Sequence, residues 1–267
     1  MVTTLACDSV YAKLGLRDAP TVLDMRTASD LAAQPRMIPG ALRCDPDTPA
    51  QWMQTLPRDR SLVLYGARDA SRAETGALAA WGLPLATLEG GFDAWTRQGF
   101  ATIAVRTELN VPGGSRWITR ERPKIDRLAC PWLIRRFIDP LALFFYVPAH
   151  QVRSEAGNLR AEPYDIADVT FTHRGPRCSF DAFLHEFGLH DPVLDFLAGI
   201  VRAADTARLE QSREAPGLLA ISLGLSAMVS DDILLLEHAM TLYDGLYAWC
   251  KTARDETHAW PQRTVAQ

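Results

Sequence analysis

The sequence predicts two units of different fold class. The first is an α/β unit, with a parallel sheet and flanking helices, over residues 1–110. The second is a mainly α-helical α+β unit over residues 111–267. Short apolar runs alternate with helical runs in the first unit, which is typical of a parallel sheet. A flexible glycine-rich segment then precedes long stretches of helical periodicity, and this predicts the second unit.

Each element of the first unit has a simple local signal. Its strands are short apolar runs bounded by turn residues, and its helices follow them. Strands are expected at 21–24, 61–65 and 85–88 and after the turn at 37–41, and helices at 29–33, at 70–82 and after the glycine pair 90–91.

In the second unit, an apolar strand is expected at 143–147 and an alternating strand at 169–173, which would turn His173 toward the core. Ser179 is a plausible N-cap for the next helix, and Asp191 with Pro192 predicts a clean helix start. Further helices are expected from Pro192 to Asp205, from Pro216 to Met228 and from Ser230 to about Cys250. The second of these is so apolar that deep burial is expected.

Composition describes an ordinary globular protein. The chain has 267 residues, 48% hydrophobic and 22% charged, with a net charge of −4 that gives no global attraction to nucleic acid. Five scattered cysteines form neither a disulfide framework nor a CxxC zinc pattern. The first residues lack the layout of a signal peptide, and no apolar run approaches bilayer length. We therefore expect a reduced, cytoplasmic protein with no membrane partner.

The stretch 124–139 carries charges on an apolar helix. Asp126 and Arg136 project toward the face that holds Trp132, so they must be paired or must face a site. Pro131 fits the first helical position, which would put Cys130 at the helix start as a thiolate. A buried Asp–Arg pair beside a packed cysteine is an equally simple interpretation.

A second cluster follows the strand expected at 169–173. His173, at the strand end, and Cys178, across a Gly-Pro turn, could present two ligands to one point. Cys130, Asp126 and Asp205 would complete a site for a divalent ion such as zinc or iron. A satisfied core histidine and a buried cysteine remain the alternative.

Arginines near these residues suggest anion binding. Arg127, Arg136 and Arg174 could hold an oxyanion, because a guanidinium donates two parallel bonds. From Pro112 to Arg136, seven Lys/Arg stand against two acids, and this basic stretch could also contact DNA. No helix-turn-helix or zinc finger is recognisable, so DNA binding is the less favoured interpretation.

The first unit resembles the rhodanese-like family. The resemblance rests on VLDMR at 22–26, IPGA at 38–41, LVLY at 62–65 and GGFDAW at 90–95, in the family's order. In active members a cysteine follows the third of these motifs and carries sulfur. This chain has Gly66 there, and Asp69 replaces a loop glycine. The resemblance therefore implies an inactive rhodanese that retains at most weak anion affinity through Arg68 and Arg72.

The second unit resembles the chromate-resistance ChrB family. The motifs are RPKIDRLACPWLIRRFID at 122–139, HRGPRCSF at 173–180, IVRAAD at 200–205 and EAPGL at 214–218. The resemblance implies a role in chromate resistance or response, with a small oxyanion such as chromate as partner. A transcription regulator that senses an oxyanion is the alternative. If the unit is an enzyme, metal-dependent redox or hydrolytic chemistry is the class to expect.

Overall fold

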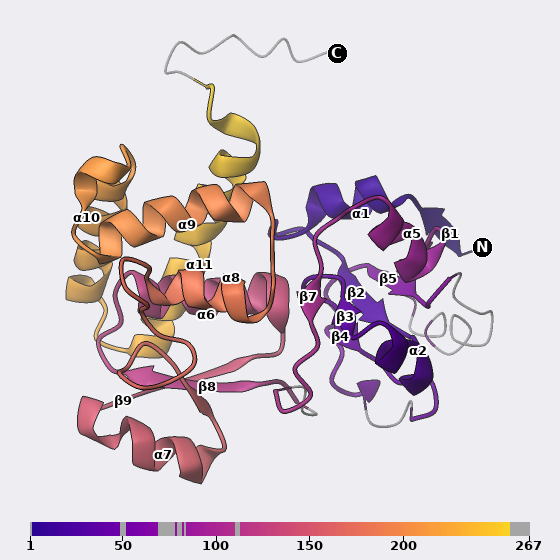
Figure 1. The fold of residues 1–267 in the computed structure, drawn as a ribbon, viewed down its shortest axis with the longest axis horizontal. Coiled ribbons are helices and arrows are strands. Elements are labelled where there is room, and N and C mark those ends of the chain that lie inside the picture. Colours follow the sequence, from indigo (N-terminus) through magenta and orange to yellow (C-terminus); the bar gives the residue numbers. More distant parts are fainter. Residues whose placement is uncertain are drawn as a thin grey trace.

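A five-stranded parallel sheet organises the N-terminal half of this computed structural model (Figure 1). The structure describes residues 2–48, 52–68, 78, 82, 84–109 and 113–256. The strand order is β1-β6-β5-β2-β4, and every pairing is parallel. The strands are β1 (Thr3–Leu5), β2 (Thr21–Asp24), β4 (Leu42–Arg43), β5 (Leu62–Tyr65) and β6 (Leu85–Leu88).

Short helices and one small extra sheet surround these strands. The predicted strands and the first and last predicted helices are confirmed, whereas most of the helix predicted at 70–82 lies outside the described residues. The helices are α1 (Cys7–Lys13), α2 (Ala28–Ala33) and α5 (Gly91–Arg97), and β3 (Arg36–Met37) pairs antiparallel with β7 (Ile103–Ala104).

The C-terminal half is helical around a small parallel sheet of order β10-β8-β9, which confirms the predicted fold class. One face of the sheet meets α7 and the other meets the helical layer (Figure 1). The strands are β8 (Arg116–Arg120), β9 (Leu143–Val147) and β10 (Glu162–Pro163). The helices are α6 (Asp126–Leu133), a π-helical continuation (Ile134–Ile138), a 3-10 turn (Ala149–Gln151), α7 (Val152–Leu159), α8 (Ser179–Glu186), α9 (Pro192–Asp205), a 3-10 turn (Leu209–Gln211), α10 (Ala215–Met228), α11 (Asp232–Ala248) and a final π-helical turn (Trp249–Ala253).

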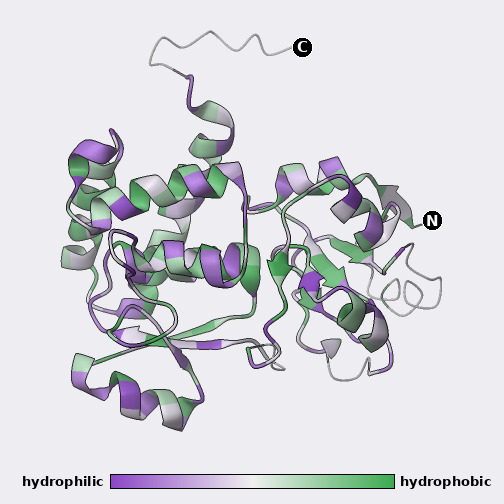
Figure 2. Cartoon of the chain, in the orientation of Figure 1, coloured by the Kyte–Doolittle hydropathy of each residue, from purple (hydrophilic) through white to green (hydrophobic). Residues whose placement is uncertain are grey.

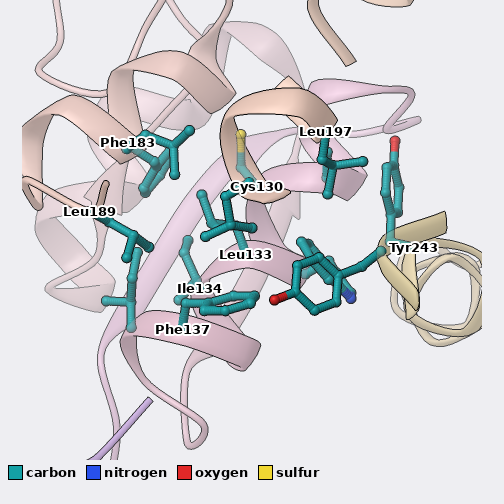
Figure 3. Packing of buried hydrophobic residues seen from close by; sticks show 14 of the residues in the cluster. Cys130, Leu133, Ile134, Phe137, Phe183, Leu189, Leu197 and Tyr243 are labelled. Carbon is teal, nitrogen blue, oxygen red and sulfur yellow. The ribbon is translucent and has the colours of Figure 1, made fainter. Parts of the chain in front are cut away.

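Helix α6 runs through the middle of the helical layer, and all of its side chains except that of Arg127 are buried (Figure 3). Pro131 lies inside this helix, so the prediction that it begins the helix is wrong. A proline there cannot bond the carbonyl of Arg127, four residues earlier. The Tyr146 hydroxyl donates to that carbonyl at 3.0 Å instead, so the orphaned acceptor is satisfied.

Three other predictions also need correction. Residues 169–173 form no strand, because Phe171 makes only an isolated bridge to Tyr164. Cys178, not Ser179, is the N-cap residue of α8. The apolar helix α10 is not deeply buried, since several of its large side chains face outward. Among the described residues, no helix combines the length and apolar content that a bilayer span requires.

One hydrophobic core runs through both halves. Where the halves meet, the Gly40 amide donates to the Phe137 carbonyl at 2.7 Å, and Arg36 donates to the Gly188 carbonyl at 2.7 Å. Gly15 has φ of +77°, and a Cβ built on it would lie 2.2 Å from the Phe137 ring. The close approach therefore requires glycine at this position. The predicted boundary near residue 110 stays a prediction.

This contact can be tested with a matched pair of glycines. Gly15→Ala introduces both backbone strain and a clash with Phe137, whereas Gly99→Ala introduces the same kind of strain at φ of +75° in open space. We expect Gly99→Ala to lower the free energy of unfolding by about 1 kcal/mol and Gly15→Ala to lower it by about 2–4 kcal/mol. Urea unfolding measures both, and equal losses would contradict the contact.

Candidate metal centre

Three carboxylates converge on one imidazole nitrogen in the C-terminal half. His173 Nε2 lies 3.1 Å from Asp205 Oδ2, 3.4 Å from Asp126 Oδ2 and 3.4 Å from Asp165 Oδ1. The side chain of Asp126 is 1% exposed, whereas that of His173 is 40% exposed. The site therefore has a buried floor and a side that solvent reaches.

The ends of secondary-structure elements position these groups. Asp126 is the first residue of α6, and Asp205 is the last residue of α9. Asp165 follows β10 with φ of +53°, and His173 lies in the loop before α8. Four segments that are distant in sequence thus meet at one point.

The residue before Asp126 is strained. Ile125 has φ of +38° and ψ of −99°, a conformation that a β-branched residue rarely adopts. Its side chain is buried, and its carbonyl accepts a hydrogen bond from the Tyr243 hydroxyl at 3.1 Å. Such strain persists only where the surroundings enforce it, and it often accompanies functional sites.

The start of α8 holds two of the carboxylates. The Ser179 amide donates to Asp126 Oδ2 at 2.5 Å, and the Ser179 hydroxyl donates to Asp165 Oδ1 at 2.8 Å. Arg120 and Arg127 lie 3.0 Å and 3.4 Å from Asp165 Oδ2. Asp165 therefore has arginine partners in addition to His173, whereas among the described residues the ion pairs of Asp126 and Asp205 are with His173 alone.

These contacts shift the ionisation of the cluster. Hydrogen bonds with Asp126, Asp165 and Asp205 favour the imidazolium and raise the pKa of His173 to about 12. Burial raises the pKa of Asp126 to about 6. Burial also acts to raise the pKa of Asp165, but hydrogen bonds from His173 and Ser179 outweigh it and the pKa is lowered. In the metal-free protein at neutral pH, a proton on His173 supplies the cationic charge that the carboxylates require.

The geometry fits a metal ion in place of that proton. One ligand atom from each of Asp126, His173 and Asp205 lies within 4.8 Å of the others. Ligands bound at about 2.1 Å stand about 3.0–3.4 Å apart around one ion, and the His173 distances to Asp205 and Asp126 fall in this range. Asp126 Oδ1 is buried without a hydrogen-bond partner, so it is free to bind an ion.

The predicted cysteine ligands Cys130 and Cys178 are not members of this group of three. Cys130 is in the middle of α6 and Cys178 caps α8, and both are fully buried. Burial raises the pKa of both thiols, so the prediction that Cys130 is a thiolate at a helix start is wrong. That these thiols bind a metal stays a prediction.

The three predicted anion-binding arginines do not converge. Arg127 lies beside Asp165 at the site, but Arg136 makes a bidentate pair with Asp244, at 2.8 Å for each bond. The guanidinium of Arg174 binds Glu186 at 2.7 Å. Anion binding by these side chains stays a prediction.

Sequence reasoning missed two carboxylates, one beside His173 and one beside Arg136. Asp165 lies in a polar loop with no periodicity, and only its proximity to His173 in the fold reveals it. Asp244 lies on α11, and its carboxylate accepts hydrogen bonds from Trp132 Nε1 and Arg136. The charge of Arg136 on an apolar face was the available signal, because a buried cation requires a partner.

Comparison with known families assigns both halves. The model of the ChrB C-terminal domain matches residues 117–250, half of the chain, and includes every residue of the site. The chain belongs to the ChrB C-terminal domain family. The rhodanese-like domain model matches residues 8–98.

Protein ChrB of Cupriavidus metallidurans is 36% identical to this chain over 142 residues. The alignment covers 53% of this chain and 42% of that protein, so the chain spans less than half the length of this ChrB relative.

Two solved structures resemble the N-terminal half. A rhodanese-related protein from Thermoplasma volcanium is 23% identical with a TM-score of 0.33, covering 38% of this chain and 96% of its own. A thiosulfate sulfurtransferase from Pseudomonas aeruginosa is 25% identical with a TM-score of 0.35, and the match covers 39% of this chain and 20% of that enzyme.

The raised pKa of His173 gives a test that needs no metal. In chelator-treated protein we expect the imidazole to stay protonated across neutral pH, well above its ordinary pKa of about 6.5. Because the folded state raises this pKa, the proton on His173 increases the free energy of unfolding. That contribution is complete below about pH 6.5 and is lost as the pH rises toward about 12. Ring nitrogen NMR during a pH titration measures the pKa directly.

The matched variants for this titration are Asp126→Asn and Asp195→Asn. The first removes the strongest cause of the shift and is expected to lower the pKa of His173. The second changes an exposed residue of α9 and is expected to leave that pKa unchanged. A wild-type His173 that titrates near its ordinary value would contradict the cluster.

Proposed function

We propose that this protein serves chromate resistance and that its ChrB C-terminal domain binds one divalent metal ion through Asp126, His173 and Asp205. The family membership supports the physiological role. The observation that carries the metal site is the approach of His173 Nε2 to both Asp126 and Asp205 at ligand-to-ligand spacing.

Charge decides between a cation and an oxyanion as the direct ligand. Asp126 and Asp205 both face the point where a ligand would lie, and neither has an arginine partner among the described residues. Two carboxylates at this spacing repel an anion and attract a cation. A small oxyanion would therefore meet this site only together with a bound metal ion.

The donor set also indicates the kind of metal. Two carboxylates and one imidazole suit zinc, iron(II) or manganese(II), and three protein ligands leave a coordination position for a small molecule. The partly exposed side of His173 gives access from solvent. Such an ion would supply Lewis-acid or redox chemistry, and Asp165 would orient the site from beside it.

Titration calorimetry of the chelator-treated full chain with Zn²⁺, Mn²⁺ and, without oxygen, Fe²⁺ tests the proposal. We expect one ion per chain for at least one metal, with a proton released because His173 must lose its own. Heats measured in buffers of different ionisation enthalpy report that proton.

Three variants and two controls sharpen this experiment. Asp205→Asn and His173→Gln remove ligands and are expected to weaken binding at least about 100-fold. Asp165→Asn removes a supporting group and is expected to cost about tenfold. Asp195→Asn on the same helix and exposed His238→Gln are the controls, and neither should change affinity. Equal binding by wild type and Asp205→Asn would refute the site, as would a wild type that binds none of the metals.

The DNA-binding alternative loses part of its support. In the basic stretch of residues 112–136, Arg120 and Arg127 lie beside Asp165, Arg135 binds Glu237, and Arg136 binds Asp244. These cations are neutralised locally, so fewer remain to contact a phosphate backbone.

We further propose that the rhodanese-like half transfers no sulfur. Gly66 follows β5 at the position where the family carries its nucleophile. The two cysteines of this half, Cys7 and Cys44, are buried, and burial raises the pKa of both thiols. Neither provides an accessible thiolate.

We expect thiosulfate:cyanide sulfurtransferase activity at the level of the uncatalysed reaction. Gly66→Cys tests whether the missing thiol is the reason, because it restores a nucleophile at the family's position. Turnover by the wild-type protein above a blank would refute the assignment.

A further inference from the structure

Helix α10 turns both of its serines toward the interior and several of its large apolar side chains toward solvent. Ser222 and Ser226 are buried at 0% and 1% exposure. Ile221, Leu223 and Met228 on the same helix are 50%, 45% and 80% exposed. An amphipathic surface helix has the opposite arrangement, so the outward face of α10 is not built for water.

The outward face has a regular shape. At 100° per residue, four small residues form a central stripe along the helix: Gly217, Ala220, Gly224 and Ala227. Leu223 flanks this stripe on one side, and Ile221 and Met228 flank it on the other. Cβ atoms built on the two glycines meet nothing within 4 Å, so the stripe is open.

Two further exposed apolar side chains follow this helix in the sequence. Ile233 and Leu234, at the start of α11, are 46% and 50% exposed and follow α10 after a short turn. No charged residue occurs between Glu214 and Asp231. Figure 2 shows hydrophobic residues along α10 at the outer edge of the molecule.

The size of this face matches a protein interface. Scaled by their exposed fractions, the five large side chains and the small residues between them present roughly 600 Å². That area is at the upper end of what a monomer exposes, and it approaches the roughly 800 Å² that each partner buries in a standard interface.

We propose that this face is the interface of a homodimer, in which α10 packs antiparallel against α10 of a second copy across a twofold axis. The small central stripe lets two helix backbones approach closely, and the flanking large side chains of each copy then cover the stripe of the other. A surface that is complementary to itself is what an isologous interface requires.

The charges around the face favour a second copy over a lipid surface. Helices that lie on anionic membranes carry lysine and arginine beside their apolar face. Here residues 214–237 contain four acids and no lysine or arginine, and Arg122, which donates to the Ser226 carbonyl, is a single cation beside α10. The face therefore lacks the row of cations that binds anionic headgroups. The dimer requires none of the metal-site residues, so it stands or falls independently of the proposed function.

Gly224→Arg tests the interface without disturbing the fold. The new side chain has open space around its Cβ, and replacing glycine raises helix propensity. Gly157→Arg is the matched control, because Gly157 also lies on an exposed helical surface with nothing within 4 Å. Light scattering coupled to size-exclusion chromatography of the full chain at micromolar concentration gives the mass.

We expect twice the 29.6 kDa chain mass for wild type and Gly157→Arg, and 29.6 kDa for Gly224→Arg with an unchanged circular dichroism spectrum. Gly224→Cys is expected to form an intermolecular disulfide under mild oxidation, which Gly157→Cys does not, since all five native cysteines are buried. A monomeric wild type overturns the proposal. So does a dimer that survives Gly224→Arg, or a monomer that binds phosphatidylglycerol vesicles through this face.

Discussion

The buried carboxylate of Asp126 is the constraint on which the C-terminal half depends. A carboxylate at 1% exposure is costly unless a cation and hydrogen bonds compensate it. The Ser179 amide supplies one bond, and His173 supplies the cationic partner. The contacts of this one carboxylate therefore fix the start of α6, the loop that carries His173 and the start of α8 relative to one another.

Supporting contacts extend outward from that charge. The hydroxyl of Tyr243, on α11, donates to the carbonyl of the strained Ile125, so α11 holds the start of α6 in place. One turn later, Pro131 leaves the Arg127 carbonyl of α6 without its helical hydrogen bond. The hydroxyl of Tyr146, on β9, donates to that carbonyl instead. Sheet and helices are therefore linked through the same short segment. A rigid frame of this kind would keep the side chains in place for the proposed metal ion.

Much of this arrangement was predictable from the sequence, for identifiable reasons. Alternating apolar runs gave the parallel strands, and charge on an apolar helix singled out Asp126 and Arg136. His173 and Asp205 were found because they stand at the ends of apolar runs. Asp165 could not be found, because its role comes from a loop whose path is set by backbone at positive φ. The thiolate prediction for Cys130 failed because Pro131 is tolerated inside a helix when another group satisfies the freed carbonyl.

The shared core between the halves has a consequence for stability. Tyr247 and Phe137 of the C-terminal half lie against Gly15, and Lys251 donates to the Tyr11 and Leu14 carbonyls. Removing the N-terminal half would expose the rings of Phe137 and Tyr247 to solvent. Burial of these rings stabilises the C-terminal half whatever chemistry the rhodanese-like half performs, so the N-terminal half also acts as a structural support for its neighbour.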